Sequence, residues 1–282
     1  NYSEIPNSNT KQLNVTDDKN FYLKVKQQGN CAIKVSTPIL INGYPVLNIT
    51  SVTGKDFVIG NELVGNLSTN ISGGKNENGY QIKWLESNNG INYTEIVGQT
   101  EQNITIGSIP NTKWYKINVN DECGSLEKSK NVIRYESLNA GVIGDAQTIC
   151  YNTAPTQLKF NTNPSGGSGT YNYQWQVSDD GTNFSDITGA TNSTYQPGNL
   201  TSNKWYRVKV NDGIQGNVIT NKIKITVNSQ LNEGIIGESQ NICYNTAPNA
   251  FGFIVGPSGG SGTYYYQWQV SDDGTNFSDI TG

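Results

Sequence analysis

The side chains most able to do chemistry lie in one oxygen-rich stretch that the sequence repeats. YQWQVSDDGTNFSDITG occupies residues 173–189 and returns letter for letter at 266–282. Carboxylate and amide oxygens are the ligands that calcium prefers, so the stretch could form a calcium site. The candidate ligands are Asp179, Asp180, Asn183 and Asp186 in the first copy and Asp272, Asp273, Asn276 and Asp279 in the second.

A related stretch earlier in the chain favours a structural turn instead. Its residues at the same places are Asn88, Asn89, Asn92 and Glu95, so the turn formers persist while most of the charge is lost. The twelve-residue spacing of a calcium loop is not met. Asp-Gly is a strong tight-turn signal, because glycine accepts a positive φ. We therefore predict a hairpin turn and no metal site, with calcium as the alternative.

The order Ser178, Asp180, Gly181, Phe184 also resembles the Asp-box hairpin of sialidases and related propellers, one residue short of its spacing. That box is a folding device, so the resemblance implies no enzyme. The chain has no histidine, and its carboxylates fall mostly in turns, so we predict no catalytic residues and no cofactor.

Two SGGSG segments, at 165–169 and 258–262, lack the lysine and helix of a phosphate loop. We predict a flexible loop between the second and third strands of each repeat. Tyr171, Tyr264 and Tyr265 lie beside it, and packing at the loop edge is favoured over stacking on a sugar or protein. Ligand-binding residues stay unassigned.

The composition limits the partners. Only 15% of the residues are charged and the net charge is −4, so neither nucleic acid nor an anionic membrane has a basic surface to bind. No apolar run is long enough for membrane insertion, and the first ten residues do not resemble a signal peptide. A targeting segment is expected to be absent or to lie upstream.

A period of about 93 residues organises the chain. Trp175 and Trp268 are 93 residues apart, as are the two copies of ICYNTAP, and KWYKINVND at 113–121 precedes KWYRVKVND at 204–212. We predict the C-terminal part of one repeat at 1–42, complete repeats at 43–136 and 137–229, and the N-terminal part of another at 230–282. Since a buried face cannot stay open to water, we expect a longer parent protein, with completion of 230–282 by another element as the alternative.

Each repeat reads as a set of short strands. TQLKF, YQWQV, KWYRVKV and NKIKITV alternate apolar and polar residues between turn-forming clusters. In YQWQV, Tyr173, Trp175 and Val177 share the expected buried face, with Gln174 and Gln176 on the wet face. About seven strands with a tryptophan on the third predict an all-β fold of tandem immunoglobulin-like β-sandwiches in an extended array.

The four cysteines do not form a complete set of pairs. Cys31 and Cys123 come late in their repeats, whereas Cys150 and Cys243 come early. Alignment of the repeats places Phe57 opposite Cys123 and Ile214 opposite Cys150, so we predict apolar contacts in place of cross-links. No disulfide is expected within the two complete repeats, and Cys31 and Cys243 are left to pair outside the fragment in an oxidising, extracellular setting.

ICYNTAP, PSGGSGTYNYQWQVSDDGTNFSDITGAT and WYRVKVND, in this order, resemble the tandem immunoglobulin-like repeats of large Bacteroidota surface proteins. These include gliding-motility adhesins and related substrates of type IX secretion. The resemblance implies a structural stalk or adhesin segment at the cell surface, whose partners are neighbouring repeats of the same longer chain. It supplies no catalytic or binding residues. The alternatives are a glycan- or protein-binding module acting through Tyr-rich loops, and accessory domains of an enzyme.

Overall fold

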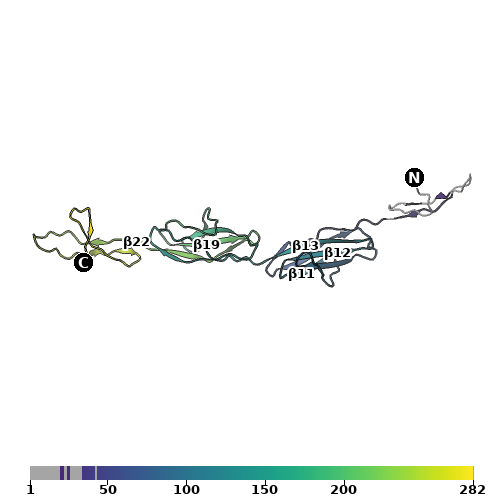
Figure 1. The fold of residues 1–282 in the computed structure, drawn as a ribbon, viewed down its shortest axis with the longest axis horizontal. Helices are drawn as coiled ribbons and strands as arrows, with labels where there is room; N and C mark the ends of the chain where they lie inside the picture. The colour runs from purple at the N-terminus through teal and green to yellow at the C-terminus, as the bar shows by residue number, and fades with distance from the viewer. Residues whose placement is uncertain (1–19, 22–23, 26–33, 42, 282) are drawn as a thin grey trace. The chain divides into compact units, whose positions relative to one another are not determined.

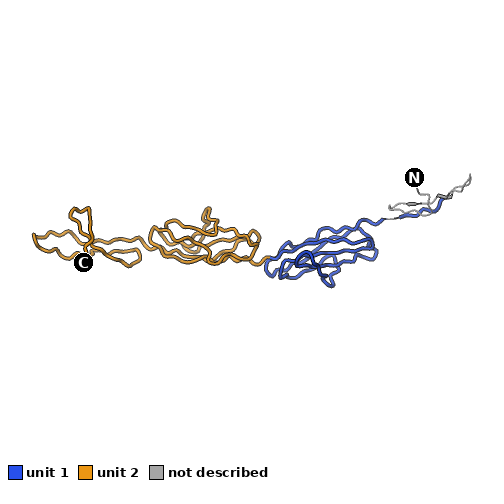
Figure 2. Tube along the Cα trace, in the orientation of Figure 1, with its two compact units in different colours: residues 1–134 blue, residues 135–282 orange. Residues whose placement is uncertain are grey.

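The computed structural model describes residues 20–21, 24–25, 34–41 and 43–281 of the 282-residue chain. These residues form strands and turns only, and none of them belongs to a helix long and apolar enough to cross a membrane. The chain divides into two compact units, residues 1–134 and 135–282 (Figures 1 and 2). The all-β prediction is confirmed.

Unit 1 is built around a five-stranded sheet of order β10-β9-β12-β13-β6, and β11 pairs with β7 and β5 with β8 in two-stranded sheets. Two further pairs, β1 with β4 and β2 with β3, precede them. The strands are β1 Asn20–Phe21, β2 Lys24–Val25, β3 Lys34–Val35, β4 Ile39–Leu40, β5 Asn48–Ile49, β6 Phe57–Ile59, β7 Leu63–Ser68, β8 Ile71–Ser72, β9 Gln81–Ser87, β10 Thr94–Glu95, β11 Asn103–Ser108, β12 Lys113–Asn120 and β13 Ser125–Tyr135.

Unit 2 contains a six-stranded sheet in which β15-β21-β19-β17-β18 follow one another and β20 also pairs with β19. Its other sheets are the pairs β14–β16, β22–β25, β23–β24 and β26–β27. The strands are β14 Val142–Ile143, β15 Gln147–Ile149, β16 Phe160–Thr162, β17 Asn172–Ser178, β18 Ser185–Asp186, β19 Lys204–Asn211, β20 Asn217–Ile219, β21 Ile223–Val227, β22 Ser229–Asn232, β23 Ile235–Ile236, β24 Phe253–Val255, β25 Ser258–Gly260, β26 Gln269–Val270 and β27 Ser278–Asp279.

A tryptophan lies at the centre of each large core. Trp84 on β9 pairs with Ile117 on β12, and Trp175 on β17 pairs with Val208 on β19; all four side chains are fully buried. The indole N–H of Trp175 donates to the carbonyl of Asn192 at 3.0 Å, so its one polar group is satisfied. The alternating residues of β12 and β19 therefore bury one face, as their period-two pattern predicts.

Two details of the strand prediction are wrong. The segment TQLKF does not form a strand over 156–160: Leu158 makes an isolated bridge with Tyr195, and β16 begins only at Phe160. Gln176, placed on the wet face by its alternation, is only 8% exposed. Its amide is buried because polar partners on the neighbouring strands satisfy it.

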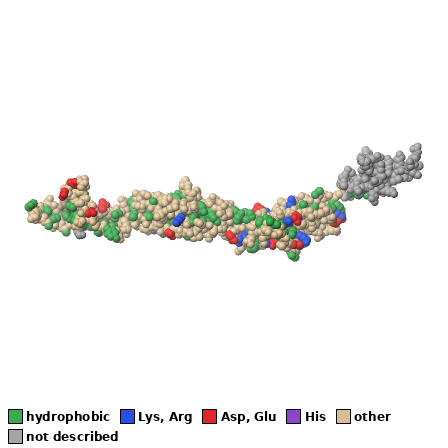
Figure 3. Space-filling model, viewed as in Figure 1, with side chains coloured by type: hydrophobic (Ala, Val, Ile, Leu, Met, Phe, Trp, Pro, Cys, Tyr) green, Lys and Arg blue, Asp and Glu red, His purple; other side chains and the backbone are tan. Residues whose placement is uncertain are grey.

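Few Lys, Arg, Asp and Glu side chains lie on the visible face of the region around β19, whereas they are more frequent around β11, β12 and β13 (Figure 3). Residues 230–281 differ from the complete cores, because Trp268 is 40% exposed while Trp175 is fully buried.

Candidate functional site

The oxygen-rich stretch folds as the predicted hairpin. β17 pairs with β18 in antiparallel register, and Gly181 in the turn has φ of 72°. One carboxylate oxygen of Asp180 accepts the N–H groups of Thr182 and Asn183 at 2.7 and 2.8 Å. The hydroxyl of Ser178 accepts the N–H of Gly181 at 2.9 Å. These bonds account for the Ser-x-Asp-Gly order, because each side chain satisfies a turn amide.

The acidic side chains of this hairpin have separate partners. Asp179 forms an ion pair with Lys204, and Asp186 pairs with Lys209 at 2.9 Å. Hydrogen bonds from the N–H groups of Asn183 and Thr182 hold the pKa of Asp180 well below its usual range. Among the described residues, no group of three or more His, Cys, Asp or Glu side chains is placed to hold a metal ion.

The same turn forms without the negative charge. In the first repeat Asn89 replaces Asp180, and its side-chain oxygen accepts the N–H groups of Ile91 and Asn92, each at 2.9 Å. In the last repeat Asp273 accepts those of Thr275 and Asn276, each at 2.8 Å. What recurs is therefore a hydrogen-bond acceptor for the turn, which is a structural requirement.

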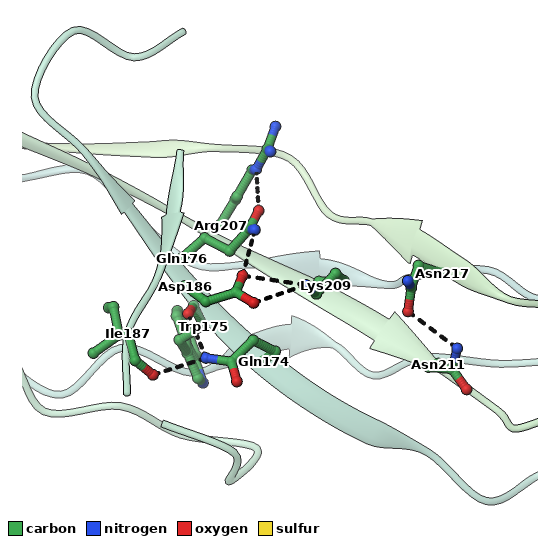
Figure 4. Close-up of polar contacts among 9 residues, drawn as sticks. All are labelled: Gln174, Trp175, Gln176, Asp186, Ile187, Arg207, Lys209, Asn211 and Asn217. Carbon is green, nitrogen blue, oxygen red and sulfur yellow. Dashed lines mark hydrogen bonds and ion pairs between the residues drawn. The ribbon is translucent and has the colours of Figure 1, made fainter. Parts of the chain in front are cut away.

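A polar network covers the outer face of the β18-β17-β19 sheet (Figure 4). Gln176 accepts the Nε–H of Arg207 at 2.7 Å and donates its amide to Asp186 at 2.6 Å. Lys209 donates to the same carboxylate at 2.9 Å, and the guanidinium of Arg207 lies 4.0 Å from the centre of the Phe184 ring. The network ties the short hairpin strand β18 to β19.

Two neighbouring pairs extend this face. The amide of Gln174 donates to the carbonyl of Ile187 at 2.8 Å, and Asn211 donates to Asn217 at 3.0 Å, joining β19 to β20 (Figure 4). Sequence reasoning missed this network, although the recurrence of Gln and Asp in both identical copies was visible in the sequence.

The SGGSG loop at 165–169 is held in place, so the prediction of a flexible loop is wrong. The N–H of Gly167 donates to the carbonyl of Glu136 at 2.9 Å, and that of Ser168 donates to the Asp212 carboxylate at 3.0 Å. Gly166 has φ of 74°, and a Cβ there would lie 2.2 Å from the Ser137 carbonyl oxygen. The glycines are needed for the close approach of backbones.

Asp212 is the residue that locks this loop, and sequence reasoning missed it. It follows β19 and is only 6% exposed. Its other carboxylate oxygen accepts the N–H groups of Ile214 and Gln215 at 3.0 and 2.7 Å. Burial works against the charged form, but these backbone bonds outweigh it and lower the pKa of Asp212.

In unit 1, the equivalent residue Asp121 holds the corresponding loop through backbone hydrogen bonds. Asp121 accepts the N–H of Lys75 at 2.8 Å, beside the Gly73–Gly74 pair, and those of Cys123 and Gly124 at 2.8 and 2.7 Å. We call this arrangement the aspartate clamp: Asp121 with the loop at 73–75, and Asp212 with the loop at 166–168. The signal that could have revealed it is the aspartate that ends both KWYKINVND and KWYRVKVND.

The tyrosines beside these loops mostly serve packing. The hydroxyl of Tyr171 donates to the carbonyl of Gly166 at 2.9 Å, and that of Tyr264 donates to Gly259 at 2.8 Å. Tyr171 also packs against the core of its repeat. Tyr265 is 95% exposed, and its equivalent in the complete repeat is Asn172.

The described cysteines Cys123, Cys150 and Cys243 are free and exposed, and Cys31 lies outside the described residues. The predicted contact between Cys150 and Ile214 is wrong. β15 runs parallel to β21, with Ile149 opposite Val227, and Asn203 caps the N–H of Val227. This places Cys150 beyond the Lys204 end of β19, whereas Ile214 follows its Asn211 end.

The predicted contact between Phe57 and Cys123 fails for the same reason. The N–H of Ile133 donates to the carbonyl of Asp56 at 2.9 Å, which places Phe57 at the Lys113 end of β12. Cys123 follows the opposite end of that strand, after Asn120.

Among solved structures, the chain is similar to the N-terminal eight Ig domains of Down Syndrome Cell Adhesion Molecule isoform 1.30.30. The TM-score is 0.55 at 13% identity, over 75% of this chain and 28% of that one. The I-band fragment I67–I69 of titin is similar with a TM-score of 0.50 at 10% identity, over 84% of this chain and 86% of that one. Identities this low show the fold alone, which is that of tandem immunoglobulin-like domains.

No curated protein matches the chain in sequence. Residues 51–136, 139–229 and 232–282 each match the model of a domain of unknown function, DUF8696. Because these three consecutive matches together cover far more than half of the sequence, the chain belongs to the DUF8696 family.

Proposed function

We propose that this chain is a structural stalk segment of a long, repetitive bacterial cell-surface adhesin, in which serial repeats extend an adhesive region away from the cell. Its place is extracellular, and its partners are neighbouring repeats of the same longer chain. Export by type IX secretion and a role in gliding motility are the finer part of this proposal, supported by the resemblance of the repeat motifs.

One observation carries the proposal. Equivalent residues of successive repeats form the same internal bonds: Asn89, Asp180 and Asp273 in the hairpins, and Asp121 and Asp212 in the aspartate clamp. Polar groups that form hydrogen bonds within their own repeat are suited to a spacer, because a spacer must stay folded without a bound ligand.

The outer polar face of the β18-β17-β19 sheet supports the same reading. Arg207 bonds to Gln176, Gln176 to Asp186 and Asp186 to Lys209, so a ligand would have to displace existing partners. The alternative, recognition of a glycan or protein through Tyr-rich loops, loses support in the complete repeat. There the hydroxyl of Tyr171 bonds to its own loop.

Small-angle X-ray scattering of the full chain tests the extension. A single compact globule of this length would have a radius of gyration of about 19 Å. The stalk proposal expects a value at least about half as large again, whereas a value near 19 Å would contradict it. A glycan array and a pull-down with the same protein address the alternative, since saturable binding would favour a recognition module over a spacer.

A further inference from the structure

Strand β11 of unit 1, labelled in Figure 1, has a paired neighbour on one side only. It pairs with β7 from Asn103 opposite Ser68 to Ser108 opposite Leu63, and Thr53 forms a bridge to Ser68 on the other side of β7. Among the described residues no strand pairs with the free side of β11. Because an edge strand directs part of its N–H and C=O groups away from its neighbour, this side is open to strand addition.

The same edge is closed to pairing in the repeat at 137–229. The two tryptophans of each complete repeat have the same separation, so Ile106 of β11 corresponds to Pro197 without a gap. Residues 194–199 form no strand, and isolated bridges at Tyr195 and Leu200 join this segment to its sheet. Proline has no N–H to donate to an added strand and is a common protection of sheet edges. The repeat at 43–136 lacks this protection.

The edge of β11 also lacks the charges that commonly prevent pairing. Its sequence, NITIGS at 103–108, has no charged residue. Ile104 is buried in the core, whereas Ile106 packs against the same core and stays partly exposed. Thr105 is exposed, and its hydroxyl donates to the Asn66 side chain at 2.7 Å. An added strand therefore meets an uncharged edge with apolar side chains on its core side.

The order of these side chains fits a second copy of the same strand. Ile104-Thr105-Ile106 reads the same in both directions, so two copies of β11 can pair in antiparallel register about Thr105. Thr105 then lies opposite Thr105, and Ile104 lies opposite Ile106 in both halves. β-Branched residues are favoured partners across strands, and no like charges meet. The contact is two-fold symmetric, so it closes with two chains.

We propose that the free edge of β11 binds β11 of a second copy of this chain, in antiparallel register about Thr105. The two β7–β11 pairs then form one continuous sheet of order β7-β11-β11-β7 across the two chains. Ile106 of each copy packs beside Ile104 of the other. Two chains are thereby joined at this repeat, which goes beyond the role of a spacer.

Analytical ultracentrifugation of the full chain over a range of concentrations tests this pairing. The unmodified chain is expected to be a monomer when dilute and to form a dimer, and nothing larger, as the concentration rises. Thr105→Lys and Thr105→Glu each place like charges at the two-fold axis and should raise the dimer dissociation constant by roughly tenfold or more. Their equimolar mixture brings opposite charges together and should dimerise again, as a one-to-one heterodimer.

Two control variants separate the edge from its surroundings. Asn66→Ala removes the hydrogen bond of the Thr105 hydroxyl without adding a charge. Gln196→Lys adds a positive charge at the position of the next repeat that corresponds to Thr105. Both variants should dimerise like the unmodified chain. In the dimer, hydrogen exchange should slow at residues 103–108 and stay unchanged at residues 194–199.

Three results would overturn the proposal: a chain that stays monomeric up to about 1 mM, a dimer that Thr105→Lys leaves intact, or charge variants whose mixture forms no dimer. Exchange at residues 103–108 that is slow in the monomer and does not change with concentration would assign the edge to another segment of the same chain, and would also overturn the pairing. Extension is measured on the dilute monomer, so a failure of the pairing leaves the stalk proposal untouched.

Discussion

Replacing Gly166 by alanine tests whether the SGGSG loop at 165–169 is held in a fixed position against its neighbours. Gly166 and Gly169 lie in the same loop with φ of 74° and 80°. A Cβ at Gly166 would lie 2.2 Å from the Ser137 carbonyl oxygen, whereas a Cβ at Gly169 would meet nothing within 4 Å. Both alanine variants therefore have the strain of a positive φ, but only Gly166→Ala also has a steric clash with the Ser137 carbonyl.

The difference in stability follows from these contacts. An alanine in the left-handed region costs about 1–2 kcal/mol, and this is the full expected effect of Gly169→Ala. Gly166→Ala also pushes the loop away, which breaks bonds such as the Gly167 N–H to Glu136 at 2.9 Å and the Ser165 N–H to Asn139 at 3.1 Å. At about 0.5–1.5 kcal/mol for each bond, we expect a total loss of about 3 kcal/mol.

Urea unfolding followed by hydrogen exchange and mass spectrometry measures each repeat separately in the intact chain. With a slope of about 1 kcal/mol per molar urea, the midpoint of the repeat at 137–229 should fall by about 3 M in Gly166→Ala and by about 1–2 M in Gly169→Ala. Equal shifts in the two variants would refute the reasoning, because a loop without fixed neighbours has nothing for the new methyl group to strike.

Three further results are expected. Asp180→Asn should fold normally at neutral pH, because Asn89 already serves in that place, but it should lose part of the acid sensitivity of its repeat. Because the pKa of Asp180 is lowered in the folded state, its charge stabilises the fold above the unfolded pKa of about 3.9, and this stability is lost as the pH falls toward the folded pKa. If Asp180→Asn and the parent lost stability equally below about pH 4, this reasoning would be contradicted. Trp175→Phe should destabilise its repeat by about 2 kcal/mol through the lost bond to Asn192 and the space left behind, and a urea midpoint within error of the parent's would count against it. The exposed thiol of Cys150 should be alkylated by iodoacetamide in the native chain, without prior unfolding, and protection until unfolding would show the exposure to be wrong.

Local patterns were sufficient for the central strands β17 and β19. The alternation in YQWQV and KWYRVKV, repeated at a fixed interval, identified Trp175 and the buried face of β19 without reference to any contact. Period-two alternation is a property of the strand itself, so it can be read from a few neighbouring residues.

The aspartate clamp depends on residues far apart in the chain and could not be read in this way. Gly and Ser are typical of flexible loops, and nothing near residues 165–169 indicates that Asp212 will bind the N–H of Ser168. The cysteine contacts failed for a related reason. Alignment of the repeats shows which positions are equivalent, but it does not show at which end of the sandwich each cysteine lies. For Cys150, that end is determined by the parallel pairing of β15 with β21.

Single-molecule force spectroscopy tests most directly the central claim that the repeats are serial, self-contained structural modules. A repeat of about 93 residues should add roughly 300 Å of contour length when it unfolds, given about 3.3–3.6 Å per residue. The two complete repeats should give two separate events of this equal size in each trace. One combined event of about twice the length, or events of unrelated sizes, would contradict the claim.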